Sequence, residues 1–134
     1  MRWGRRAQVI SVVVPVHDVE DYLPAALDSI LAQSHADLDV VVVDDGSTDG
    51  SGAIADEYAA RDHRVQVHHI ANRGLGGARN EGMRHVRGDL VTFADSDDVV
   101  PPGSYAVLHH QLRRTGADFV TGSVARLEGD RVTE

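Results

Sequence analysis

Acidic side chains in this sequence gather in short clusters, each directly after an apolar run. Asp44 and Asp45 follow one run, and Asp95, Asp97 and Asp98 follow another. Clustered carboxylates repel one another, and a hard divalent cation such as Mg²⁺ or Mn²⁺ relieves that repulsion through oxygen ligands. Such ions leave room for phosphates, so the Asp-Ser-Asp triplet predicts a metal that carries a diphosphate. An isolated triplet of this kind also caps turns, and its place after an apolar run favours the metal.

The first acidic pair opens the sequence Asp-Asp-Gly-Ser-Thr-Asp at residues 44–49. Its glycine suits a turn, and any one of the last three residues suits a helix N-cap. Neither role explains two adjacent aspartates at the end of a strand. A carboxylate placed there can accept a hydrogen bond from the imide N–H of a nucleotide base.

A glycine-rich segment at residues 72–80 carries two arginines, Arg73 and Arg79. It is not a dinucleotide fingerprint, because a G-x-G-x-x-G motif counted from Gly74 needs its third glycine at Arg79. Backbone N–H groups at a helix N-terminus and arginine forks both bind phosphate oxygens, so the segment predicts an anion site. A simple loop ahead of a helix explains the glycines equally well.

The chain has eight histidines, and only one is a candidate for a functional site. His68-His69 and His109-His110 are adjacent pairs, whose members point to opposite faces of a strand. No two histidines have the spacing of a helical zinc pair. His17 follows the first apolar run and is the one candidate; we expect the others to be solvated or hydrogen-bonded.

Composition excludes several classes of protein. The 134 residues suit one domain, and 42% hydrophobic residues suffice for a core. The net charge of −8 argues against a nucleic-acid binder, which needs a basic face. Without Cys the chain has no disulfide, thiolate zinc ligand or thiol nucleophile. Without Lys it has neither a Walker phosphate loop nor Schiff-base chemistry.

Apolar runs alternate with amphipathic stretches, which predicts an α/β fold with a mostly parallel sheet and helices on both faces. The acidic clusters then fall at the carboxyl ends of the strands, where such sheets bind ligands. Strands are predicted at residues 9–16, 38–43, 65–70, 90–94 and 117–120. Helices are predicted at residues 21–33, from after residue 49 to residue 60, from the glycine-rich segment to residues 87–88, and from the prolines at 101–102 onward.

The domain is predicted to span residues 9–127, with an N-terminal tail at 1–8 and a polar, frayed C-terminal tail at 128–134. The basic start followed by an apolar run has the outline of a secretory signal, but the run is short and no small-x-small cleavage site follows. No stretch reaches the ~18–20 apolar residues of a membrane span. We therefore predict a cytoplasmic location, with the basic start available for peripheral contact with anionic lipid at the inner face of the membrane.

Five motifs in order resemble the nucleotide-binding half of an inverting glycosyltransferase of family 2, which has the GT-A fold. The resemblance covers roughly residues 8–120. The motifs are Ser11-Val-Val-Val-Pro15-Val-His17-Asp18, the helix segment Tyr22-Leu23 with Leu27-Asp28-Ser29-Ile30-Leu31-Ala32-Gln33, Val43-Asp44-Asp45-Gly46-Ser47-Thr48-Asp49, Asn72-x-Gly74-x-x-x-Ala78-Arg79-Asn80-x-Gly82, and Phe93-x-Asp95-Ser96-Asp97-Asp98.

The resemblance implies how the nucleoside would bind. Pro15, Val16 and His17 would lie against the base and the ribose, and Asp45 would accept a hydrogen bond from the uracil imide. Many relatives have Tyr-Asn where this chain has His17 and Asp18.

The resemblance also implies the rest of the donor site. Arg79 would lie near the diphosphate, Asp95 would face the ribose or the metal, and Asp97 would hold the bridging Mg²⁺ or Mn²⁺. The donor would be a nucleotide-activated sugar, in the first place UDP-linked. The acceptor would be a saccharide, lipid or polyol, as in cell-envelope or polysaccharide synthesis. In the family, acceptor recognition and the catalytic base lie in a further segment. We therefore expect the base beyond Glu134, in a longer enzyme of which this chain resembles the first domain.

Other classes of protein share some of these features. A non-catalytic module that binds a nucleotide sugar would have the same residues and stays open. A sugar nucleotidyltransferase would need a glycine-rich Arg or Lys loop after the first strand, and residues 17–20 are not one. A response-regulator receiver domain also has aspartates at its strand ends. It requires a lysine, which this chain lacks, so that class is excluded.

Overall fold

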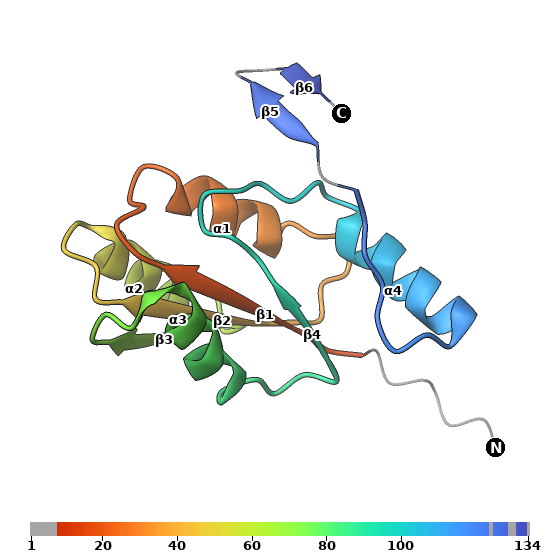
Figure 1. Cartoon of the computed structure of the whole chain (residues 1–134), viewed down its shortest axis with the longest axis horizontal. Helices are drawn as coiled ribbons and strands as arrows, with labels where there is room; N and C mark the ends of the chain where they lie inside the picture. The colour runs from red at the N-terminus through yellow and green to blue at the C-terminus, as the bar shows by residue number, and fades with distance from the viewer. Residues whose placement is uncertain (1–7, 124, 129–130, 134) are drawn as a thin grey trace.

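A four-stranded parallel sheet forms the centre of this computed structural model, which describes residues 8–123, 125–128 and 131–133 (Figure 1). The strands lie in the order β3-β2-β1-β4. The predicted parallel α/β architecture is confirmed. The strands are β1 (Ile10–Val16), β2 (Leu38–Asp45), β3 (Val65–Ile70) and β4 (Leu90–Phe93).

The two central strands are valine-rich and buried along their whole length. Both faces of such a strand must be covered, which is why its sequence is a continuous apolar run instead of an alternating one. β1 and β2 pair in register from Ile10 with Leu38 to Val16 with Asp44. This register brings the ends of both strands, and the polar residues that follow them, to the same edge of the sheet.

Helices cover both faces of the sheet, as predicted. On one face, α1 and α2 and the buried Tyr105 of α4 form the larger hydrophobic core. On the other face, α3 packs through Ala78 on Val13, Val41 and Val43. The helices are α1 (Leu23–Leu31), α2 (Ser51–Arg61), α3 (Gly74–Met83) and α4 (Ser104–Thr115). None of the described helices is both long and apolar enough to cross a membrane.

The glycine-rich segment opens a helix, as predicted, and the helix includes the glycines of the segment from Gly74 onward. α3 begins at Gly74 and ends at Met83, before the predicted end near residues 87–88. Packing on the sheet overrides the poor helix propensity of glycine. The chain leaves the helix because amides after it bind the sheet: Arg87 N–H donates to Asp39 Oδ2 (2.8 Å) and Gly88 N–H to Ser11 Oγ (2.8 Å).

Gly82 lets α3 approach the sheet closely. A Cβ at this position would collide with Val13 Cγ1 and lie 3.3 Å from Val43 Cγ2. Both valines are fully buried and stiff at χ1. Gly82→Ala should therefore lower the free energy of unfolding by about 1–3 kcal/mol, measured by chemical denaturation. Gly76→Ala on the same helix meets no atom within 4 Å and should raise it by up to about 1 kcal/mol. Equal losses in both variants would contradict this packing.

The predicted strand at residues 117–120 is wrong. The segment lies beside the outer edge of β4, across a cavity of ≈ 310 Å³ lined by Leu90, Val91, Phe119 and Val120 among others. A strand is defined by its ladder of hydrogen bonds, and within the described part of the chain this segment pairs with no strand. Phe119 is accordingly 80% exposed.

A hairpin of β5 (Arg126–Glu128) and β6 (Arg131–Thr133) follows. Its second strand lies within the predicted frayed tail, so that expectation is wrong for residues 131–133. Gly129 and Asp130 lie outside the described residues. Residues 1–7 also lie outside the described residues, so the N-terminal tail and its lipid contact stay predictions.

Candidate functional site

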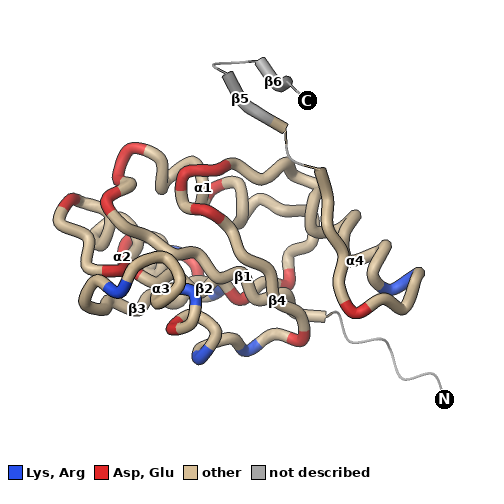
Figure 2. The backbone as a smooth tube through the Cα atoms, in the orientation of Figure 1, with Lys and Arg blue, Asp and Glu red and all other residues tan. Residues whose placement is uncertain are grey.

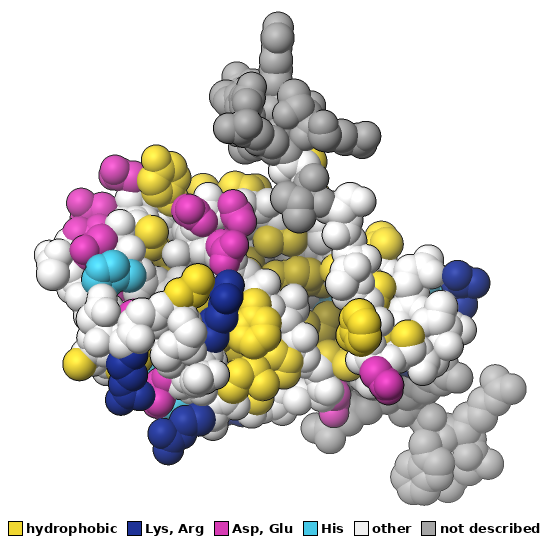
Figure 3. All heavy atoms as spheres, viewed as in Figure 1, with side chains coloured by type: hydrophobic (Ala, Val, Ile, Leu, Met, Phe, Trp, Pro, Cys, Tyr) yellow, Lys and Arg dark blue, Asp and Glu magenta, His cyan; other side chains and the backbone are white. Residues whose placement is uncertain are grey.

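A cavity of ≈ 470 Å³ opens at the carboxyl edge of the sheet, between the ends of β1 and β2, the start of α3 and the loop after β4. Figures 2 and 3 show acidic residues gathered along this rim of the molecule. The lining brings together all seven residues predicted for the site: Pro15, Val16, His17, Asp45, Arg79, Asp95 and Asp97.

Asp45 is held in one orientation at the floor of this cavity. Its side chain is only 3% exposed, and its Oδ1 accepts the backbone N–H of Arg73 at 2.7 Å. Within the described part of the chain, Oδ2 has no hydrogen bond. A carboxylate fixed through one oxygen presents the other as an acceptor of defined direction.

His17 joins the ends of the two central strands. Its Nδ1 lies 2.9 Å from the backbone oxygen of Asp45, to which it donates in the tautomer that carries the proton on Nδ1. Its Nε2 lies 3.5 Å from Asp18 Oδ2, and the ring is about half exposed. His17 thus links the ends of β1 and β2 in the lining of the cavity.

The loop after β1 holds the turn after β2, and the residues that do this were not predicted. Asp18 Oδ1 accepts Thr48 N–H at 2.6 Å, and Glu20 Oε2 accepts Gly50 N–H at 2.8 Å. Asp18 adopts φ 48°, in the left-handed region that aspartate tolerates better than most residues. A helix-cap pattern identifies the amides of such a turn, but not the side chains from a distant loop that bind them.

Arg79 is the arginine of the glycine-rich segment that faces the cavity. One of its terminal nitrogens lies 3.5 Å from Asp95, and its guanidinium carbon lies 5.8 Å from the Phe93 ring centroid. Its Nε is buried without a hydrogen-bond partner among the described residues. An unpaired buried N–H is costly, and a phosphate oxygen would satisfy it. Arg73 instead pairs with Glu81 (3.3 Å), so of the two arginines of this segment Arg79 alone lines the cavity.

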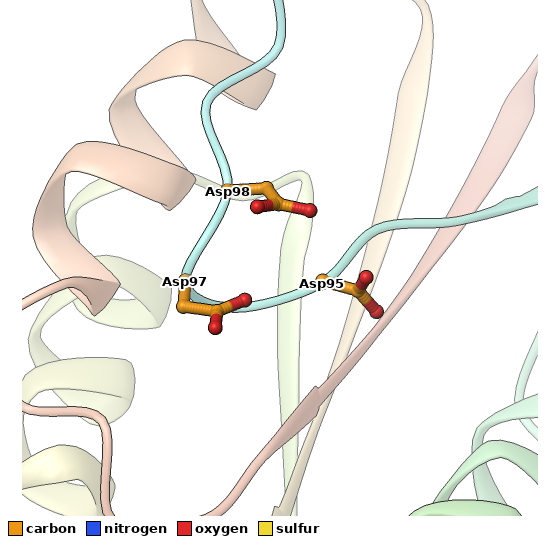
Figure 4. A group of neighbouring side chains, drawn as sticks. All are labelled: Asp95, Asp97 and Asp98. Carbon is orange, nitrogen blue, oxygen red and sulfur yellow. The ribbon is translucent and has the colours of Figure 1, made fainter. Parts of the chain in front are cut away.

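The loop after β4 carries the second acidic cluster (Figure 4). One carboxylate oxygen from each of Asp95, Asp97 and Asp98 lies within 4.8 Å of the others. Burial, reinforced by repulsion from its two neighbours, raises the pKa of Asp98 above its usual value. Oxygen donors this close fit a divalent cation such as Mg²⁺ or Mn²⁺.

The adjacent aspartates at the end of β2 point to opposite faces. Asp45 faces the cavity, whereas Asp44 packs beside α2 and accepts a hydrogen bond from His69 Nδ1 at 2.7 Å. The alternation of side chains along a strand explains the division. The sequence predicts that Asp44 and Asp45 both lie at the end of a strand. It does not predict the contact of Asp44 with His69, because His69 comes from a different strand.

Comparison with known proteins gives consistent matches. The family model described as Glycosyl transferase family 2 matches residues 11–133. The curated protein "Glycosyltransferase GlyA" of Streptococcus pneumoniae is 42% identical over 114 residues, which is 85% of this chain and 16% of that protein.

Two solved structures are similar in fold and were determined with donors. TarS 1–349 of S. aureus, in complex with UDP-GlcNAc, aligns with a TM-score of 0.75 and 30% identity over 81% of this chain and 32% of that one. The mannosyltransferase PcManGT of Pyrobaculum calidifontis, in complex with GDP-Man and Mn²⁺, aligns with a TM-score of 0.61 and 29% identity over 73% of this chain and 30% of that one. This chain therefore spans about a third or less of the length of these proteins.

Proposed function

Because the chain belongs to glycosyl transferase family 2, we propose that it binds a nucleoside-diphosphate sugar, in the first place a UDP-sugar, as the donor-binding part of an inverting glycosyltransferase. The observation that carries the proposal is the convergence of Asp45, Arg79 and Asp97 on one cavity. Such a donor needs a hydrogen-bond acceptor for its nucleotide base, a cation for its phosphates and a carboxylate that holds the metal ion.

The nucleoside is proposed to lie at the β1 and β2 end of the cavity. Asp45 there offers its unbonded oxygen to the imide N–H of uracil. Pro15, Val16 and His17 line the adjoining wall and would pack against the base and ribose. The complex of TarS with UDP-GlcNAc supports this choice of donor class, and the GDP-Man complex of the second neighbour keeps guanine as the alternative base.

The diphosphate is proposed to lie between Arg79 and the loop after β4. The guanidinium would pair with phosphate oxygens through its Nε–H. Asp97, with Asp95, would hold Mg²⁺ or Mn²⁺, which when bound supplies positive charge to the leaving diphosphate. The Mn²⁺ in the mannosyltransferase complex supports a divalent ion here. The Arg79 guanidinium and the metal ion together offset the negative charge of the diphosphate, which the acidic rim would otherwise repel.

Transfer also needs a base that takes the proton from the acceptor hydroxyl, within hydrogen-bond reach of it. The carboxylates that line the cavity are already used: Asp45 for the nucleotide base, Asp95 and Asp97 for the metal. We therefore place the catalytic base outside these 134 residues. A saccharide, lipid or polyol acceptor, and a role in polysaccharide or cell-envelope synthesis, belong to the same proposal.

Calorimetric titration with UDP, in Mn²⁺ and in chelator, tests the proposal. We expect UDP to bind in Mn²⁺ and to bind at least about tenfold more weakly in chelator, since the metal joins protein to diphosphate. Equal affinity in both buffers would overturn the metal site, and no binding of UDP or GDP would overturn the donor site.

The alternative, a non-catalytic module of a larger protein, shares the donor site. Release of UDP from UDP-sugars by the longer protein containing this chain distinguishes the two. An enzyme releases UDP faster when an acceptor is added, whereas a module binds the donor and releases none.

A further inference from the structure

His69 lies between two carboxylates outside the donor cavity. Its Nδ1 is 2.7 Å from Asp44 Oδ2, and its Nε2 is 2.8 Å from Asp56 Oδ1. The three residues come from three elements: His69 from β3, Asp44 from β2 and Asp56 from α2. Gly52 of α2 leaves room for the contact, because a Cβ there would lie 2.8 Å from Asp44 Oδ2.

Both ring nitrogens of His69 must donate. Ionised carboxylates offer only acceptors, so an imidazole facing one on each side needs a proton on each nitrogen. His69 is therefore an imidazolium in this arrangement. Its charge compensates Asp44, whose side chain is only 9% exposed, while Asp56 is mostly solvent-exposed.

Asp44 connects this imidazolium to the turn at residues 46–49, which follows Asp45 of the cavity lining and packs on Asn72, another lining residue. Its other oxygen, Oδ1, accepts the backbone N–H of Ser47 at 3.1 Å. The hydroxyl of Ser47 in turn accepts the backbone N–H of Asp18 at 3.2 Å. Gly46, at φ 68°, presses the same turn onto Asn72, where a Cβ would lie 2.8 Å from the backbone nitrogen. The carboxylate of Asp44 thus holds the turn through one oxygen and is itself held through the other.

We propose that His69 is a positioning residue for the donor: its imidazolium fixes Asp44, and Asp44 fixes the turn at residues 46–49 beside the base pocket. His69 does not line the cavity, so it acts only through Asp44. The proposal rests on the proposed function, because it takes nucleotide binding as its readout.

A pH dependence follows from the geometry. Hydrogen bonds to Asp44 and Asp56 raise the pKa of His69 above its usual value, against a smaller opposing effect of burial. Burial tends to raise the pKa of Asp44, but hydrogen bonds from Ser47 and His69 together lower it. The groups that face His69 are Asp44 on β2 and Asp56 on α2, with His68 next to it on β3. The contact between the His69 imidazolium and Asp44 is present at pH values below the raised pKa of His69 and is lost as the pH rises through it.

The test is the affinity for UDP in Mn²⁺, measured by calorimetry between pH 6.5 and 9 for wild type, His69→Ala, His69→Gln and Asp56→Asn. Thermal unfolding at each pH verifies that every variant is folded. His110→Ala, which removes an exposed histidine on α4, is the matched control. Comparing each variant with wild type at the same pH cancels the titration of the ligand itself.

We expect His69→Ala to weaken UDP binding about tenfold at pH 7, and the gap to wild type to close as the pH rises. His69→Gln retains one donor for Asp44 without the charge, so it should recover part of the affinity and show no alkaline loss. Asp56→Asn keeps the contact to Asp44 but removes one of the two groups that raise the pKa of His69. Its alkaline loss should therefore begin at a lower pH than in wild type.

A difference in affinity between wild type and His69→Ala that does not change with pH, or variants that lose thermal stability while keeping wild-type affinity, would overturn the positioning role. Either result would leave the donor site intact. Failure of wild type to bind UDP or GDP at any pH would instead overturn the proposed function.

Discussion

Replacing Asp97 by alanine should make UDP binding equally weak with and without Mn²⁺. In wild type we expect the metal to strengthen UDP binding roughly 10–100-fold. Mutating a residue that only hydrogen-bonds to a metal ligand commonly costs that factor in metal affinity, so losing the bound metal should cost at least as much. Asp97 lies on the loop after β4 with a carboxylate oxygen within 4.8 Å of one from Asp95 and one from Asp98. Removing this ligand leaves two carboxylates that face a diphosphate without the ion between them. Calorimetry in Mn²⁺ and in chelator measures the difference.

The control for this variant removes the same charge far from the site. Asp37 is exposed and directly precedes β2, at the opposite edge of the sheet. Asp37→Ala changes the net charge equally and should keep the full metal effect. If Asp97→Ala still bound UDP more tightly in Mn²⁺ than in chelator by the wild-type factor, the ion would have to sit elsewhere.

Much of this fold could be predicted from local pattern. The valine-rich runs predicted β1 and β2 to within two residues, because a strand buried on both faces has no other sequence pattern. Pro24 in the first turn of α1 and the spacing of Leu23, Leu27 and Ile30 predicted that helix and its buried face. The common edge of parallel strands then predicted which of the site residues meet.

The errors arose where a distant partner decides the local structure. Residues 117–120 have the composition of a strand, but a strand needs a neighbour to bond with. α3 ends before residues 87–88, because side chains of β1 and β2 bind the amides of Arg87 and Gly88. For His69 the sequence predicts only that it is solvated or hydrogen-bonded, and its hydrogen bonds are confirmed; its two partners could not be predicted, because they come from 25 and 13 residues away in the chain.

The hydrogen bond between Asp45 and Arg73 makes the base preference of the site predictable. Because Arg73 N–H occupies Oδ1 at 2.7 Å, the second oxygen is left as a pure acceptor, which in the proposed binding mode would face the nucleotide base. It can accept the imide N–H of uracil, whereas cytosine presents another acceptor at the same position. Leaving a buried acceptor unpaired costs about 1–3 kcal/mol, so UDP should bind wild type roughly one to two decades more tightly than CDP.

Asp45→Asn should reverse this preference, not merely weaken it. The Arg73 N–H still needs an acceptor, so the amide oxygen of the asparagine should take that place and turn its NH₂ group toward the base. An N–H donor there suits the acceptor of cytosine and opposes the imide of uracil. CDP should then bind at least as tightly as UDP, as competition titrations in Mn²⁺ would measure, while Asp37→Asn keeps the wild-type order. Equal affinities of UDP and CDP in wild type would show that Asp45 does not contact the base. A uniform loss for both nucleotides in Asp45→Asn would assign it to holding the Arg73 backbone alone.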